Sequence, residues 1–80
     1  MSRYTKELED GRTIAYGYDR ALGYFIDVFG IPDEQGVSES LVEESSMLTG
    51  MSNGKMIELM DMFELPESHI EMVAMDLPIE

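Results

Sequence analysis

The chain has 80 residues, and we expect residues 1–80 to form one small acidic domain. It contains no Cys and one His, so neither a disulfide framework nor a zinc site of the Cys/His kind fits this composition. Seventeen acidic residues against five basic ones give a formal net charge of −12. A surface of that charge repels nucleic acid and anionic lipid, and it attracts basic proteins.

The charge is unevenly distributed along the chain. Residues 1–20 hold four acids and four bases, which cancel. The remaining 60 residues hold 13 acids and a single base, Lys55. The net negative charge therefore belongs to the last three quarters of the sequence.

The hydropathy pattern gives no sign of a membrane segment. No apolar run approaches the roughly 18 residues that a membrane-spanning helix needs, and the N-terminal residues lack the apolar stretch of a signal peptide. We therefore expect a cytoplasmic protein that contacts neither membranes nor nucleic acid directly.

The first 18 residues predict a β-hairpin. A three-residue loop over residues 9–11 places Tyr4 opposite Tyr16 and lets Gly11 take the left-handed position that ends a type I turn with a bulge. This register sorts the two faces of the hairpin. The apolar face then carries Tyr4, Leu8, Ile14, Tyr16 and Tyr18.

Residues 20–29 predict a first helix. Asp19 suits its N-cap, Gly30 can take a left-handed C-cap, and Pro32 prevents continuation. Helical spacing gathers an apolar stripe of Leu22, Phe25, Ile26 and Phe29.

Residues 33–46 are polar and acidic and predict an exposed loop. Within this loop, the apolar pair Leu41 and Val42 is compatible with a short third strand near residues 40–43, added to the hairpin.

Two further helices are predicted to close the chain. Ser52 can cap a helix that runs to about Phe63, and Pro66 suits the first position of a helix that ends near residue 76. Their inward faces are predicted to be Met56, Leu59, Met60 and Phe63 in one helix and Ile70, Val73, Ala74 and Leu77 in the other. The predicted fold is α+β, with an N-terminal hairpin, or a three-stranded sheet if the short strand forms, packed against three short helices.

The segment TGMSNGKM, residues 49–56, superficially suggests a phosphate-binding loop. It fails the pattern because Gly50 stands one residue too late and Met56 replaces the Ser or Thr that would bind magnesium. The favoured interpretation is a helix start capped by Ser52. A minority interpretation is a weak anion site formed by Lys55 and the amides of residues 53–55.

No other pattern predicts catalysis. His69 lacks an acid at i+4, since Val73 stands there, and is expected to be a solvated or carboxylate-paired surface side chain. Adjacent acids in polar runs usually point into water, and the serines at 45 and 46 have no basic partner nearby in sequence. We therefore expect no enzyme activity, no metal and no cofactor, and we keep a small enzyme or metal-binding domain as the least favoured hypothesis.

The charge and the Met-rich C-terminal half favour a protein-interaction module. Such a module would cover a basic surface of a partner, in the manner of a DNA mimic that inhibits a nucleic-acid-binding protein. Met62, Met72 and Met75 lie off the best apolar stripes, so they are candidates for an exposed Met-lined groove. The predicted partner-binding residues are Asp33, Glu34, Glu39, Glu43, Glu44, Glu58, Asp61, Met62, Glu64, Glu67, Glu71, Met72 and Met75. The alternative is a small accessory or regulatory protein that forms a homodimer through the same helices.

Overall fold

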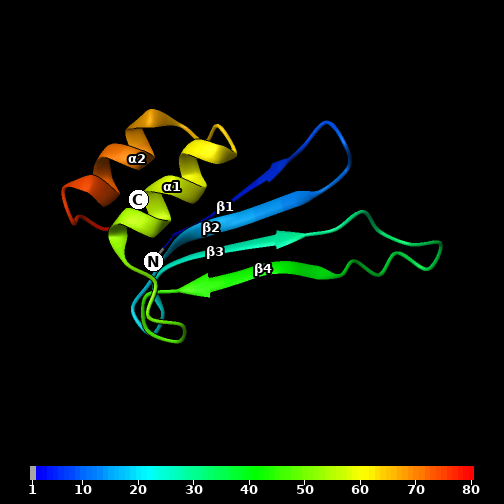
Figure 1. Cartoon of the computed structure of the whole chain (residues 1–80), viewed down its shortest axis with the longest axis horizontal. Helices are drawn as coiled ribbons and strands as arrows, with labels where there is room; N and C mark the ends of the chain where they lie inside the picture. Colours follow the sequence, from blue (N-terminus) through cyan, green and yellow to red (C-terminus); the bar gives the residue numbers. More distant parts are fainter. Residues whose placement is uncertain (1) are drawn as a thin grey trace.

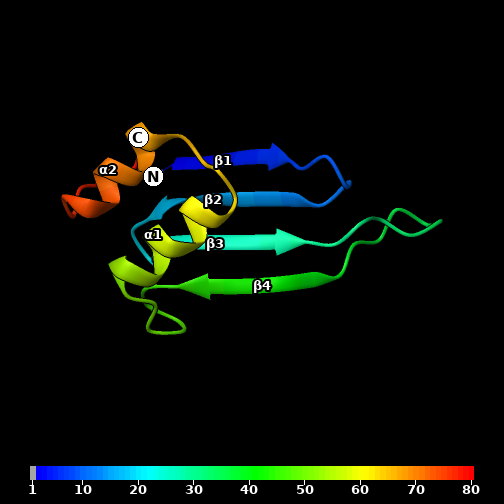
Figure 2. The same cartoon turned by 45° about the horizontal axis from the view of Figure 1, so that its top comes forward.

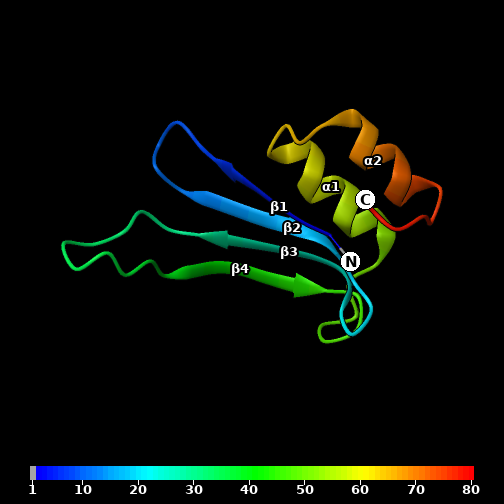
Figure 3. The same ribbon diagram turned by 180° about the vertical axis from the view of Figure 1, so that it is seen from behind.

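The computed structural model describes residues 2–80 as a four-stranded antiparallel sheet followed by two helices (Figure 1). The strands pair in chain order, so the sheet is a meander. The two helices lie on one face of the sheet, and the described part of the chain leaves the other face uncovered (Figures 1 and 3). The elements are β1 (Ser2–Glu7), β2 (Thr13–Asp19), β3 (Gly23–Phe29), β4 (Ser40–Ser45), α1 (Asn53–Met62) and α2 (Glu67–Ala74).

The predicted hairpin is confirmed as β1 and β2, in the predicted register. Tyr4 pairs with Tyr16, and the amide of Leu8 donates to the carbonyl of Arg12 across the turn at 2.7 Å. Gly11 has a φ of +96°, a conformation that glycine adopts without the strain other residues would carry. Local turn chemistry thus sets the register of the first two strands.

The predicted helix over residues 20–29 is wrong, because β3 occupies most of this segment and pairs with both β2 and β4. Asp19 closes the β2–β3 turn instead of capping a helix, since its carboxylate accepts the amide of Ala21 at 2.7 Å. Gly30 is not a helix cap either, because its amide donates to the carbonyl of Glu39 at 2.7 Å and extends the β3–β4 pairing. The molecule therefore has two helices, not three, within the described residues.

The short strand that the sequence allowed near residues 40–43 is present as β4, but it pairs with β3 and not with the hairpin as predicted, so it is the fourth strand of the sheet. Val42 pairs with Val28, and a bulge interrupts the ladder between Val28 and Phe29. Between β3 and β4 the chain forms an arm, residues 30–39, that projects away from the helices (Figure 2). The carboxylate of Asp33 accepts the amides of Gln35 and Val37 at 2.9 and 3.0 Å, so the arm is ordered by its own hydrogen bonds.

The helix α1 matches the prediction closely. The hydroxyl of Ser52 accepts the amide of Lys55 at 3.1 Å, which is a side-chain N-cap. Met56 and Met60 are fully buried, and Leu59 is 6% exposed. The predicted inward face of this helix is therefore confirmed.

The helix α2 is shorter than predicted. Pro66 is its N-cap and not its first helical residue. Val73 is fully buried, but Ala74 and Leu77 are exposed, contrary to the prediction that they face inward. The cause is the helix end at Ala74, after which the backbone turns at Asp76 with a φ of +59° and abandons helical spacing.

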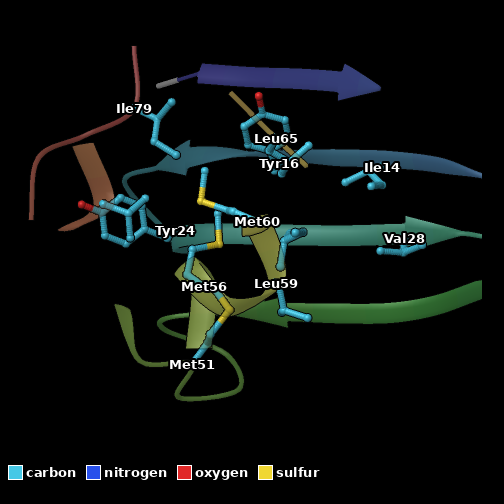
Figure 4. Close-up of a cluster of buried hydrophobic side chains, with 12 residues drawn as sticks. Ile14, Tyr16, Tyr24, Val28, Met51, Met56, Leu59, Met60, Leu65 and Ile79 are labelled. Carbon is cyan, nitrogen blue, oxygen red and sulfur yellow. The ribbon is translucent and has the colours of Figure 1, made fainter. Parts of the chain in front are cut away.

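The core is one apolar layer between the sheet and the helices (Figure 4). Hydroxyls of the sheet also hold the C-terminal segment, residues 75–80, against this layer. Tyr24 donates to the carbonyl of Leu77 at 2.6 Å, and the hydroxyls of Ser2 and Tyr4 donate to carbonyls at the last two residues. The core residues include Ile14, Tyr16, Tyr24, Ile26, Val28, Met56, Leu59, Met60, Val73 and Ile79.

The helices α1 and α2 are both short. Neither is long and apolar enough to cross a membrane. The cytoplasmic location inferred from the sequence stays a prediction.

A pair of glycine substitutions tests the packing of β1 on β2. A Cβ added at Gly17 would lie 2.2 Å from the carbonyl oxygen of Ser2, so Gly17→Ala forces the two backbones apart. We expect it to lower the free energy of unfolding by about 1–3 kcal/mol or more. The control Gly54→Ala adds a methyl group to α1 with only Ser52 nearby, and it should stabilise the protein by about 0.5–1 kcal/mol. Urea unfolding measures both; equal effects of the two substitutions would contradict the proposed strand packing.

Candidate functional site

The acidic residues of the described chain are almost entirely without ion pairs. Among residues 2–80 one salt bridge occurs, between the Nε atom of Arg12 and the Oδ2 atom of Asp10 at 2.6 Å. The backbone amide of Arg12 also holds the pKa of the Asp10 carboxyl below its ordinary value. Both residues belong to the β1–β2 turn, so this pair neutralises none of the acids that follow residue 20.

Two other bases of the hairpin serve the fold. The ammonium of Lys6 donates to the carbonyls of Phe63 and Glu64, each at 3.1 Å, where α1 ends. A cation at a helix C-terminus complements the helix dipole, so Lys6 ties β1 to α1. The guanidinium of Arg3 lies 5.9 Å from the centre of the Phe25 ring. Lys6 forms no salt bridge with an outer carboxylate among residues 2–80, and Arg3 offsets the charge of Asp27 only in part.

The predicted partner-binding residues fall in three separate regions. The first region is the arm, where Asp33, Glu34 and Glu39 are all exposed. The arm stands at the end of the molecule farthest from the helices (Figure 2). The structure therefore does not bring these three carboxylates together with those of α1 and α2.

The second region is the outer side of the helices. Met62 and Met75 are 63% and 68% exposed, as their positions off the apolar stripes predicted. Met72 instead packs partly against the core, so the expected Met-lined groove is reduced to two exposed methionines. The exposed carboxylates of this region are Glu58, Asp61, Glu64, Glu67 and Glu71.

The third region is β4, whose two adjacent acids point to opposite faces of the sheet. Glu44 pairs with Ile26 and so lies on the helix side, near Lys55 in a shallow hollow. Glu43 pairs with Asp27 and lies on the uncovered side. The prediction grouped Glu43 and Glu44 in one surface, and the pleat of the strand separates them.

The uncovered face of the sheet has two hollows that the sequence analysis missed. Asp27 and Phe25 point to this face, and neither was among the predicted site residues. Two adjoining hollows of about 210 and 150 Å³ share Leu22, Phe25 and Asp27 in their walls. The signal was the period of two in residues 24–28, where Tyr24, Ile26 and Val28 face the helices while Phe25 and Asp27 face the other side. A helical interpretation of this segment concealed that alternation.

The electrostatics of this face centre on Asp27. Burial of the half-buried side chain raises the pKa of the Asp27 carboxyl, and the neighbouring charge of Glu43 raises it further. Arg3 acts in the opposite direction but does not cancel these effects. The ionised form of Asp27 is therefore disfavoured where the structure holds it.

His69 is half-buried, and its hydrogen-bond partner is a tyrosine hydroxyl and not a carboxylate, so the predicted surface position is wrong. Its Nδ1 atom lies 2.7 Å from the hydroxyl of Tyr16, and its ring is centred 4.4 Å from the ring of Tyr4. Burial raises the pKa of the Tyr16 hydroxyl. The reason for the difference is tertiary: α2 brings His69 against Tyr4 of β1 and Tyr16 of β2, which no local spacing reveals. We assign His69 a packing role that fixes α2 on the sheet.

The segment 49–56 forms the entry to α1, as predicted. Ser52 caps the helix, and the side chain of Lys55 is exposed. Among residues 2–80 no three His, Cys, Asp or Glu side chains gather in an arrangement that could hold a metal ion. The absence of catalytic and cofactor chemistry stays a prediction.

Comparisons with protein-family models, with curated proteins and with solved structures found no match.

The raised pKa of Asp27 makes a pH-dependent prediction. The pKa of Asp27 is higher in the folded protein than in the unfolded chain. As pH rises from the ordinary Asp range through the raised pKa, the free energy of unfolding therefore falls, because the ionised carboxyl is disfavoured in the fold. We expect Asp27→Asn to raise the melting temperature at neutral pH, and to leave it nearly unchanged at about pH 3, where Asp is largely protonated in both states.

Thermal unfolding followed by circular dichroism at the two pH values measures this effect. The control Glu9→Gln makes the same change of charge at an exposed turn position. A lower melting temperature of Asp27→Asn at neutral pH would contradict our account of the uncovered face.

Proposed function

We propose that the protein is a non-enzymatic interaction module whose acidic surface binds a basic surface of another protein. The observation that carries the proposal is the uncompensated charge. Thirteen acids follow residue 20, and none of those within residues 2–80 takes part in a salt bridge. Carboxylates without salt-bridge partners repel one another, and a basic partner relieves that repulsion.

The arrangement of the carboxylates supports a rigid binding surface. The acids of α1 and α2 stand on two short helices that are fixed to the sheet by Met56, Met60 and Val73, all fully buried. Exposed Met62 and Met75 supply apolar contact beside them. A partner surface that binds nucleic-acid phosphates has the matching charge, so we propose that the protein competes for such a surface.

The homodimer alternative has weaker support. Met56 and Met60 belong to the core, and Met72 packs partly against it, so few methionines remain for a self-pairing interface. Two copies would also bring together two formal charges of −12.

Binding to an arginine- and lysine-rich peptide tests the proposal. Because salt screens exposed charges, affinity measured by fluorescence anisotropy should fall by about tenfold or more between roughly 50 and 500 mM NaCl. The triple variant Glu58→Gln, Glu67→Gln and Glu71→Gln should weaken binding at low salt more than Glu34→Gln with Glu39→Gln on the arm. Affinity independent of salt, or no binding at low salt, would contradict the proposal.

The same uncompensated charge makes a prediction about stability. Added NaCl should raise the melting temperature of the protein, because screening weakens the repulsion among the acids around a small core. NaCl and a neutral osmolyte at matched osmolality, compared by calorimetry, separate screening from general solvent effects. A melting temperature that does not respond to NaCl would indicate that the acids do not repel one another appreciably.

A further inference from the structure

The larger hollow on the uncovered sheet face combines an apolar wall with the carboxylates of Asp27 and Glu43; Glu44 also borders it, but its side chain lies on the helix side of β4. Leu22, Phe25 and Leu48 line it; Leu48 is 76% exposed, whereas Phe25 is only 6% exposed and forms the floor. Asp27 and Glu43 pair across β3 and β4, so their side chains lie next to each other on the same face. The volume of the hollow is about 210 Å³.

The smaller hollow shows how this face accommodates a guanidinium. Arg3, Gly17 and Phe25 stand in one row across β1, β2 and β3. Because Gly17 has no side chain, the guanidinium of Arg3 reaches over the Phe25 ring at 5.9 Å from its centre. The same guanidinium opposes the rise in the pKa of Asp27. One end of the face thus already holds an arginine on an aromatic ring beside a carboxylate.

The larger hollow has a similar combination of an aromatic ring and a carboxylate, but no basic residue lines it. It shares Phe25 and Asp27 with the smaller hollow, and Glu43 adds a second carboxylate. No base contributes to its wall, and no ion pair within residues 2–80 includes Asp27 or Glu43. The two carboxylates repel each other there, and a bound cation would remove that repulsion.

We propose that this hollow binds the side chain of an arginine that a basic partner protein presents. The alkyl stem of that arginine packs on Leu22 and Leu48 beside the small exposed part of Phe25, and its guanidinium bonds the carboxylates of Asp27 and Glu43. The inference depends on the proposed function and adds to it a specific site, on the face opposite to α1 and α2. It therefore predicts a partner that reaches around the edge of the sheet or binds this face alone.

Arginine fits this site better than the other candidate ligands. Its planar guanidinium bonds two carboxylate groups with fixed geometry and stacks on aromatic rings, which the ammonium of lysine does less well. A calcium ion takes six to eight oxygen ligands, whereas this site offers two carboxylates beside apolar side chains. A second copy of the chain brings a formal charge of −12 to an acidic face.

The test is a titration of the ¹⁵N-labelled protein with N-acetyl-arginine amide, followed by amide chemical shifts. The largest shifts should fall on residues 22–27 and 43–49. Asp27→Asn and Glu43→Gln should each weaken the affinity by about two- to fivefold, the range of partly exposed ion pairs. The control Glu9→Gln removes the same charge on the β1–β2 turn and should leave the affinity unchanged. Glu43 is exposed, so its variant is expected to fold even if Asp27→Asn does not.

A second comparison tests the apolar part of the site. Leu48→Ser should weaken the binding of N-acetyl-arginine amide, because this ligand has an alkyl stem. The binding of guanidinium chloride at low concentration, which has no alkyl stem, should stay unchanged. Equal losses for both ligands would overturn the assignment of Leu48 to the stem.

The outcomes separate this inference from the proposed function. If the arginine and lysine peptide binds but the arginine probe shifts amides of α1 and α2 instead, the site is wrong and the proposed function stands. If neither the peptide nor the probe binds, both fail. Calcium chloride that shifts the same amides at lower concentration than the probe would overturn arginine as the ligand.

Discussion

The contact between one face of the β2–β3 pair and the two helices supports the rest of the structure. Tyr16 and Ile26 lie in the same buried layer as Met56 and Met60, and the chain has no Cys to add a disulfide (Figure 4). Burial of this layer is therefore the main source of stability, because apolar area removed from water is the dominant favourable term in folding. In 80 residues, two short helices cover one face of a four-stranded sheet and leave the other open. The open face and its hollows exist because the chain has no further helix to cover them within the described residues.

The small number of basic residues explains the negative surface charge. Lys6 and Arg12 are used at the end of α1 and at the first turn, and Arg3 lies on Phe25. The acids that follow β2 have almost no bases left to pair with, so their charge faces outward. On α1 and α2, Glu58, Asp61, Glu67 and Glu71 are exposed, as are Met62 and Met75 near the ends of the two helices. On the open sheet face, Asp27 is held close to a second carboxylate, which makes that face the more specific of the two.

Local signals were sufficient for the β1–β2 hairpin and for α1, because a turn glycine and a capping serine decide those elements within a few residues. They failed for residues 20–29, where the apolar side chains fit two periods at once. Phe25, Ile26 and Phe29 satisfy the helical period, while Tyr24, Ile26 and Val28 satisfy the strand period, and pairing with strands on both sides decides between them. The site on the open face was missed for this reason. His69 was misjudged because its partners, Tyr4 and Tyr16, come from the other end of the chain.

Arg3 offsets the charge of the half-buried Asp27 only in part, and in our proposal a basic partner supplies a second cation to the open face. The most direct measurement is an NMR titration of the Asp27 carboxyl carbon, first in the protein alone and then with the arginine- and lysine-rich peptide bound. We expect a pKa above the ordinary Asp value in the protein alone, and a lower pKa in the complex, because a bound cation favours the ionised form. An Asp27 pKa at or below the ordinary value in the protein alone, unchanged by the peptide, would contradict the account.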